Sequence, residues 1–384
     1  MTDDIRPMRV VLGGIPALSD ILGRYHERAA VLDSFHGHGA LLTGDRRHGK
    51  TCLTRLVEAA AATDHCVVRI SAERSSFEEF VEALADEIAG ADSGFRREIE
   101  NWRVSLRAGP LSVERAGRTR SLDALVRAAL RAHPDQLLVL SLDEIPVLAK
   151  AMEVKDQGSG GELLHLLRRL RQEHSGRLVM VLSGSIGFHH VTDDALGAAN
   201  DVVKVAVGPL AEEDAVYLAR CLLLGEGVQT TDELAVGRAI ATAAERVPYY
   251  VHQLVKSARD LSQRRGAAIT PTDVPALVDD ALTDRDDPWD LRHYRDRIPT
   301  YYGAHHEDLV AEILDAYATA PGALSVDAVG RRLDVADLET RPGRSALIRL
   351  IERLEADHYL VRVGDDSRFA SDLVRRAWLA HRRR

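Results

Sequence analysis

The segment from Gly44 to Thr51 has the residue types and spacing of a phosphate-binding loop, Gly-Asp-Arg-Arg-His-Gly-Lys-Thr. Its glycines let backbone N–H groups close around a phosphate, Lys50 can reach the β and γ oxygens of a nucleotide, and the Thr51 hydroxyl can ligate Mg²⁺. An apolar run precedes the segment and a helical pattern follows it, so a helix N-terminus adds partial positive charge at the same point. We therefore predict that the chain binds a nucleoside triphosphate with Mg²⁺ as cofactor. The predicted binding residues are Gly44, Asp45, Arg46, Arg47, His48, Gly49, Lys50, Thr51 and Cys52.

A second group of candidate residues follows the apolar run 137–142, which ends in Asp143 and Glu144. A buried strand here delivers Asp143 to its carboxyl end, where the carboxylate can hold Mg²⁺ through water. Glu144 is then placed to orient and deprotonate an attacking water. Open α/β sheets bind ligands at the carboxyl ends of their strands, so both motifs are expected to meet there. The alternative is a strand that simply ends in two acids.

A third candidate group, Ser183-Gly184-Ser185, directly follows the apolar run 178–182. A polar side chain at this strand end can sit between the γ-phosphate and the attacking water, and Ser183 is favoured because it comes first after the run. The competing interpretation is a turn that only ends the strand.

The composition is that of a globular protein with two or three packed units, because 384 residues are 45% hydrophobic and 28% charged. A net charge of -9 argues against a protein that coats nucleic acid, so any DNA contact must be local. The three cysteines, Cys52, Cys66 and Cys221, form no spaced cluster, which predicts no zinc site and a reducing compartment. We find no signal peptide pattern and no apolar run of about 18 residues, and therefore expect a cytoplasmic location and no membrane partner.

The order of elements predicts an α/β core with a parallel sheet covered by helices on both faces. The expected strands are the apolar runs 40–42, 66–70, 137–142, 178–182 and 202–207. We expect a helix that starts at Ser121 and ends at Pro134, whereas residues 91–119 show little periodicity. From residue 211 the pattern is helical only, and near the end two short strands follow helices, as in a winged helix-turn-helix. The predicted domains are 1–210 for the core, 211–300 for a helical lid and connector, and 301–384 for the winged helix.

Several short motifs together resemble one known family. They are Gly23-Arg24 with Glu27, Arg46-Arg47, Asp143-Glu144-Ile145-Pro146, Ser183-Gly184-Ser185 and Val247-Pro248-Tyr249. In this order they resemble the archaeal-type ATPases, which are relatives of the STAND and origin-recognition AAA+ proteins, over roughly residues 20 to 384. The resemblance implies an AAA+-like core with a lid and a winged helix, and ATP as the nucleotide. It also implies that Gly23 and Arg24 pack near the adenine and that Pro248 closes over the nucleotide.

Two features depart from the family pattern. No arginine occurs between Ser183 and Leu210, where a family member often carries a finger for a neighbour's nucleotide. Since such fingers stabilise transition-state charge, we expect slow turnover or a finger from elsewhere. The candidates for such a finger are Arg168, Arg169 and Arg171. The alternative interpretation is that these arginines form a solvated helix face. In the lid, Arg246 and Val247 precede Pro248 where a turn with glycine is expected.

The C-terminal unit carries cations along its expected recognition helix, namely Arg341, Arg344, Arg349 and Arg353. A DNA-reading helix needs donors in the groove and cations on the flanking phosphates. Three nearby acids, Glu352, Glu355 and Asp357, would repel phosphate. The sequence therefore leaves open whether this unit binds duplex DNA, docks on a protein or has only a structural role.

Three functions are consistent with these motifs. The first is an ATP-hydrolysing molecular switch, in which Lys50, Thr51, Asp143, Glu144 and Ser183 act on ATP and the lid and wing reorient. The second is a DNA-binding regulator or loader whose wing is gated by nucleotide. The third is a slow, partner-sensing ATPase of a defence or conflict system, which works through an effector protein encoded separately. The sequence leaves open whether the chain forms a homo-oligomer.

Overall fold

The computed structural model describes residues 5–73, 76–91, 93–108, 115–192, 195–303, 306–333 and 341–382. The chain forms two compact units, one from Ala17–Val207 and one that combines Met1–Pro16 with Gly208–Arg384. Each unit is described by itself below.

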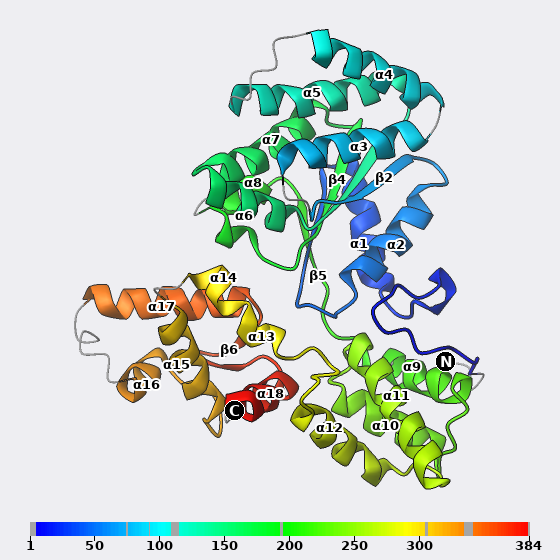
Figure 1. Cartoon of the computed structure of the whole chain (residues 1–384), viewed down its shortest axis with the longest axis vertical. Coiled ribbons are helices and arrows are strands. Elements are labelled where there is room, and N and C mark those ends of the chain that lie inside the picture. Colours follow the sequence, from blue (N-terminus) through cyan, green and yellow to red (C-terminus); the bar gives the residue numbers. More distant parts are fainter. Residues whose placement is uncertain are drawn as a thin grey trace. The chain divides into compact units, whose positions relative to one another are not determined.

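The first unit is built on a five-stranded parallel sheet with the strand order β2-β3-β4-β1-β5 (Figure 1). Its strands are β1 (Gly39–Thr43), β2 (Cys66–Ser71), β3 (Leu138–Asp143), β4 (Leu178–Leu182) and β5 (Val203–Ala206). Its helices are α1 (Tyr25–Asp33), α2 (Lys50–Ala61), α3 (Phe77–Ala91), α4 (Ser93–Ala108), α5 (Arg115–Ala132), α6 (Ile145–Lys155), α7 (Ser159–Glu173) and α8 (Ala195–Ala199). Short 3-10 turns lie at Leu18–Asp20, Ser34–His36 and Phe188–His190. The sheet confirms the predicted α/β core.

Helices cover both faces of this sheet, as Figure 1 shows. Along β3, Leu138, Leu140 and Leu142 point into the core shared with α3 to α7, whereas Val139 points into the core shared with α1 and α2. Successive side chains of a strand point to opposite faces, so a strand buried on both sides must be a continuous apolar run. This is why the strands could be recognised in the sequence.

Three consecutive helices, α3, α4 and α5, connect β2 to β3. The prediction that Ser121 starts a helix is wrong, because α5 already begins at Arg115 and Ser121 lies inside it. The stretch in which we found little periodicity contains the helix α4 over Ser93–Ala108, while residues 92 and 109–114 lie outside the described part. Phe95, Ile99 and Trp102 of α4 are buried at spacings of four and three residues, a helical stripe among exposed charges.

The second unit begins with a helical lid of α9 (Glu212–Gly225), α10 (Glu233–Ala243), α11 (Pro248–Arg265) and α12 (Val274–Thr283), with a 3-10 turn at Pro271–Asp273. The N-terminal segment packs onto this lid. The Met8 N–H donates to the Cys221 carbonyl at 3.0 Å and the Val10 N–H donates to Glu226 at 2.9 Å. A Cβ at Gly225 would lie 1.8 Å from the Met8 carbonyl oxygen, so only glycine permits this approach.

The rest of the second unit is a winged helix. Its elements are α13 (His293–Asp296), α14 (Ile298–Tyr302), α15 (Glu307–Ala318), α16 (Val326–Arg332), α17 (Arg341–Ala356), β6 (Leu360–Val363), β7 (Asp366–Phe369) and α18 (Asp372–Arg382). The antiparallel hairpin β6–β7 is the wing, and Leu324 bridges to Ser367 as a third short strand position. This arrangement matches the expected hairpin after helices. Among the described residues, no helix is both long and apolar enough to cross a membrane.

Candidate active site

The phosphate-binding loop connects β1 to α2 through backbone conformations that glycine favours. Gly44 has φ 138° and Gly49 has φ 90°, and Arg47 adopts the left-handed region at φ 71° without being glycine. A Cβ at Gly44 would lie 2.3 Å from the carbonyl oxygen of Val207, so no larger residue fits there without a shift. Gly49 occupies the N-cap position of α2, which places the helix N-terminus at the loop.

The loop presents hydrogen-bond donors that the protein does not use. Within the described residues, the backbone N–H groups of His48 and Gly49 and the hydroxyl of Thr51 make no hydrogen bond. The Lys50 ammonium donates to the carbonyl oxygens of Gly44 at 2.8 Å and Asp45 at 3.0 Å. Half-buried donors around a helix N-terminus form an anion-binding concavity. The arrangement fits a polyphosphate, which can replace the backbone partners of Lys50.

Arg24 supports this loop from α1. Its Nη2 donates to the His48 carbonyl at 2.7 Å and its Nη1 pairs with Glu27 at 2.9 Å, while the side chain is 3% exposed. Gly23 and Arg24 both have positive φ, 68° and 67°. The structure thus places Arg24 against the loop backbone. Its predicted role beside an adenine stays a prediction, as does that of Gly23.

Burial lowers the pKa of the His48 imidazole, with smaller contributions from Lys50 and Arg24, and Asp45 opposes them. The ring is therefore neutral near neutral pH, and its Nδ1 donates to the Val207 carbonyl at 3.2 Å. His48 thus ties the loop to the end of β5.

The second motif lies at the same edge of the sheet as the loop. In the strand register Leu182 of β4 pairs with Leu142 of β3 and with Leu41 of β1, so the carboxyl ends of the three strands are aligned. The hydroxyl of Ser183, which is 2% exposed, donates to Asp143 Oδ1 at 2.6 Å. Ser183 is therefore brought to Asp143 as its place after β4 predicts, and its action on a γ-phosphate stays a prediction.

Asp143 lies close enough to α2 to affect the pKa of a carboxyl group on that helix. Burial raises the pKa of the Glu58 carboxyl on α2, and the charge of Asp143 raises it further, against lowering by Ser141 and two arginines. The predicted Mg²⁺ ligands Thr51 and Asp143 thus belong to elements that are neighbours.

Glu144 has a contact that the sequence did not predict. It sits between β3 and α6 at φ 59°, a conformation that costs of order 1–3 kcal/mol for a residue other than glycine. Its Oε2 accepts hydrogen bonds from both the backbone N–H and the hydroxyl of Ser185, each at 2.9 Å. Both serines of the third candidate group therefore contact an acid of the second.

The candidate arginines have structural partners. Arg171 has no exposed side-chain surface and forms a bidentate pair with Asp201 at 2.8 and 3.0 Å. Arg168 donates to the Gly197 carbonyl, and the exposed Arg169 lies 3.6 Å from Glu173. Arg171 therefore cannot serve as a finger for another molecule without breaking a buried ion pair.

The predicted lid residue Pro248 begins α11 in the other compact unit, so its place over a nucleotide stays a prediction. The preceding turn has two consecutive left-handed residues, Glu245 at φ 50° and Arg246 at φ 61°. This is the turn for which glycine was expected, and the chain makes it without glycine.

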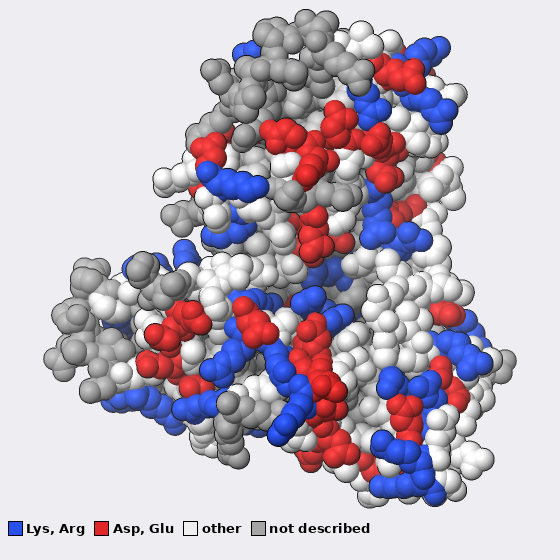
Figure 2. All heavy atoms as spheres, viewed as in Figure 1, with Lys and Arg blue, Asp and Glu red and all other residues white. Residues whose placement is uncertain are grey.

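In the winged helix several of the described cations are paired with acids. Arg344 pairs with Asp327, and Arg362 pairs with Glu355, whose other oxygen accepts from Ser367. On the face shown in Figure 2, basic and acidic side chains are interspersed over this unit. Arg349 is exposed and has no hydrogen bond or ion pair within the described residues. The side chain of Arg341 lies outside the described part.

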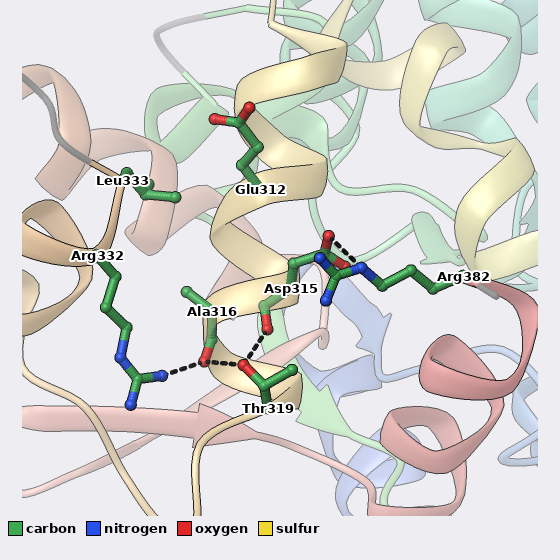
Figure 3. A pocket seen from close by; sticks show the side chains of 7 residues that line it. All are labelled: Glu312, Asp315, Ala316, Thr319, Arg332, Leu333 and Arg382. Atoms are coloured by element: carbon green, nitrogen blue, oxygen red, sulfur yellow. Dashed lines mark hydrogen bonds and ion pairs between the residues drawn. The ribbon is translucent and has the colours of Figure 1, made fainter.

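A cavity of about 350 Å³ opens beside α15, and none of the predicted site residues is part of its lining (Figure 3). It is lined by Glu312, Asp315, Ala316, Thr319, Arg332, Leu333 and Arg382. Arg332 donates to the Ala316 carbonyl and Arg382 pairs with Asp315, whereas Glu312 has no hydrogen bond or ion pair within the described residues.

Comparison with solved structures identifies the fold. The chain is similar to the Walker-type ATPase of Pyrococcus abyssi, with a TM-score of 0.62, 18% identity and coverage of 98% of this chain and 99% of that one. It is also similar to the ORC2 protein of Aeropyrum pernix, solved in ADPNP–ADP complexes, with a TM-score of 0.55, 13% identity and 97% of each chain covered. No protein-family model and no curated protein matches the sequence.

These likenesses extend over nearly the whole chain and confirm the predicted fold, an AAA+-like P-loop core with a helical lid and a C-terminal winged helix. The resemblance to origin-recognition ATPases, first indicated by short motifs, thus holds for the architecture.

Proposed function

We propose that the chain binds ATP with Mg²⁺ and hydrolyses it slowly, as a nucleotide-dependent molecular switch. The observation that carries this proposal is that two sets of groups with unused hydrogen-bonding capacity lie at the same edge of the sheet. The loop offers the unused N–H groups of His48 and Gly49, and nearby Asp143 and Glu144 each have one carboxylate oxygen engaged by a serine.

The residues present fit the metal and the nucleotide. The Thr51 hydroxyl and the Asp143 carboxylate are oxygen ligands of the kind that Mg²⁺ prefers, the carboxylate acting through water. The metal would supply positive charge on the phosphate oxygens. Lys50 exchanges its two carbonyl partners for phosphate oxygens. Glu144 takes a proton from the attacking water as that water adds to the γ-phosphorus.

The positions and partners of the arginines lead us to expect slow turnover. Arg171 is committed to Asp201, and the segment from Ser183 to Leu210 contains no arginine. Arginine fingers contribute factors of about 10³–10⁵ to such reactions. We propose that a second copy of the chain or a separate partner protein supplies this charge, so that assembly stimulates hydrolysis.

Calorimetry with MgATP tests the binding half of the proposal. Lys50→Ala removes a charged donor to the phosphates and is expected to weaken binding about 10- to 100-fold. Lys256→Ala is the matched control, because Lys256 pairs with Asp260 on the surface of the lid helix α11. Absence of any binding heat from the unmodified chain would refute the proposal.

Release of labelled phosphate tests the hydrolytic half. Glu144→Gln is expected to lower turnover by about 100-fold or more while nucleotide affinity is kept. Glu153→Gln provides a control on α6, since Glu153 only caps the backbone N–H groups of Gly158 and Gly160. Equal turnover in Glu144→Gln and the unmodified chain would remove Glu144 as the base.

A second function, nucleotide-gated binding of duplex DNA by the winged helix, is favoured by the charges around α17. Of the three acids expected to repel phosphate, Glu355 is neutralised by Arg362, and Asp357 is buried and accepts from Tyr302. Arg349 remains exposed on the same helix.

The DNA hypothesis is tested by titrating duplex DNA with and without a nonhydrolysable ATP analogue. Arg349→Ala should lower affinity and reduce the salt slope by about one. Arg376→Ala is the control, because Arg376 on α18 pairs with Asp279. No binding at low salt would reject this function.

A further inference from the structure

The side chain of His48 contacts the end of the sheet, although His48 belongs to the phosphate-binding loop. Its Nδ1 donates to the Val207 carbonyl at 3.2 Å, and the buried Val207 directly follows β5. The proposed function uses only the backbone N–H of His48, so it assigns no role to the imidazole.

Val207 contacts both ends of the loop. Its N–H donates at 2.7 Å to the carbonyl of Thr43, which directly precedes the loop, and its carbonyl accepts from His48 near the end of the loop. A Cβ at Gly44 would lie 2.3 Å from the Val207 carbonyl oxygen, so the first loop residue packs directly against the same peptide group. A change in the conformation of the loop must therefore move Val207 or break one of these contacts.

The segment that follows Val207 leads directly into the lid. Gly208 and Pro209 connect it to the buried Leu210. The Leu210 N–H donates to the Arg246 carbonyl at 2.9 Å, and Arg246 lies in the turn that precedes α11. Only two residues thus separate a peptide group held by the loop from one held by a turn of the lid.

A bound polyphosphate would restrain His48 from a further side. The backbone N–H of His48 makes no hydrogen bond within the described residues and can donate to a phosphate oxygen. Its carbonyl already accepts from Arg24 at 2.7 Å, and its ring bonds to Val207. With all three groups engaged, the imidazole loses conformational freedom, and so does the peptide group that it contacts.

We propose that His48 is a positioning residue that transmits phosphate occupancy of the loop to the entry of the lid through Val207. The inference deepens the proposed function and rests on it. The phosphates alone are sufficient for this effect, because the contacts involve the loop and neither the base nor the ribose. The segment 207–210 becomes more ordered when the loop is filled.

Hydrogen exchange of the backbone amides in the segment 205–210 tests the proposal, with Mg²⁺ and tripolyphosphate as the probe. Calorimetry sets a saturating concentration for each protein. In the unmodified chain the probe is expected to slow exchange about 2- to 10-fold, the factor that one hydrogen bond supplies. In His48→Ala this response should be lost at saturation. In His48→Asn it should return, because the amide nitrogen can replace Nδ1 as the donor.

His65→Ala is the matched control. His65 is a half-buried histidine of the same unit, and its ring lies 6.1 Å from that of Phe35. Its side chain makes no hydrogen bond within the described residues, so this variant should keep the full response. Loss of the response in both alanine variants would show that removal of any imidazole has this effect, and would overturn the assignment.

The remaining outcomes separate this inference from the proposed function. A full response to tripolyphosphate in His48→Ala would overturn the role of His48 and leave ATP binding intact. A response that only a nonhydrolysable ATP analogue produces would do the same, because the effect would then pass through the base or the ribose. If neither compound binds the unmodified chain, the proposed function fails and this inference fails with it.

Exchange without any ligand measures the contact itself. The segment 205–210 is expected to exchange about 2- to 10-fold faster in His48→Ala than in the unmodified chain, and at the original rate in His48→Asn. An unchanged rate in His48→Ala would show that the imidazole does not hold Val207, and would overturn the inference whatever the ligands do.

Discussion

The carboxyl and amino edges of the five-stranded sheet hold their polar groups with different partners. At the carboxyl edge, Lys50 bonds to backbone carbonyls, and Asp143 and Glu144 bond to serines. Near the amino ends of β4 and β5, Arg171 and Asp201 pair with each other through two hydrogen bonds.

This difference distinguishes the candidate site at the carboxyl edge from a structural ion pair at the amino edge. A charged side chain that bonds only to neutral groups can exchange them for a ligand at little cost. It gains electrostatic energy when a ligand of opposite charge binds. A bidentate ion pair is charge-assisted and complete, and removal of one member leaves a buried charge without compensation. We therefore expect changes at the carboxyl edge to affect ligand binding and chemistry, and changes at the amino edge to affect stability.

The largest effect on stability is expected for Arg171→Leu. The substitution leaves Asp201 buried and unpaired and should lower the free energy of unfolding by about 3–5 kcal/mol. Chemical denaturation of the full chain, followed through the transition of the core unit, measures it. Arg169→Leu on the same helix removes an exposed pair and should cost less than about 1 kcal/mol. Equal losses in the two variants would contradict the contrast between the edges.

A second prediction extends the comparison to a group in the lid that has only a backbone partner. The Nδ1 of His252 on α11 accepts the Val11 N–H at 3.2 Å, and burial lowers the pKa of the ring to about 4, while Glu226 opposes this weakly. Between pH 6.5 and about 4 the unfolded chain binds a proton that the folded lid does not. Stability should therefore fall as pH falls through this window, by up to about 3 kcal/mol.

Thermal denaturation across this pH window checks the prediction. His252→Asn is the informative variant, because its amide oxygen can accept the Val11 N–H and does not titrate. We expect this variant to lose less stability on acidification. An acid loss as large as that of the unmodified chain would assign the effect to other groups.

The smallest effect is expected at Glu245, a carboxylate held by a single backbone donor. It accepts the Leu373 N–H at 2.8 Å and so caps α18, which begins 127 residues after it at Asp372. Glu245→Ala should destabilise the second unit by about 1 kcal/mol, and Glu245→Gln, which keeps an acceptor, by less. Denaturation of the three proteins under one condition orders them. If Glu245→Ala lowered the free energy of unfolding as much as Arg171→Leu, the expected difference between a buried ion pair and a carboxylate with one hydrogen bond would be contradicted.

Much of the core was readable because its elements repeat one physical rule. The run 178–182 coincides with β4, and the other four runs locate their strands to within two residues. The inner strands are apolar because they are buried on both faces, whereas the outer strands β2 and β5 are only partly buried. The meeting of the loop with Asp143 and Ser183 follows from the same rule, because aligned parallel strands end at one edge.

Long-range contacts of polar residues could not be read in this way. A serine after a strand is ordinary, and only the packing of Gly184 on Pro146 brings Ser185 to Glu144. Arg24 carried a motif signal, but its bond to the His48 carbonyl depends on the fold of a loop 24 residues away.

Helix α4 and the first residues of α5 were missed for another reason. Phe95, Ile99 and Trp102 show a helical spacing that the surrounding arginines obscured. This signal was present in the sequence. By contrast, nothing in residues 5–12 indicates that they bond to the lid.

That packing of the first residues means that the backbone crosses between the two compact units twice, at Pro16–Ala17 and at Val207–Gly208. A protease cut at the second crossing would leave the fragments held together by the N-terminal segment on α9 and α11. Any reorientation of the lid must likewise be accommodated by both crossings at once, which permits far fewer motions than a single flexible joint.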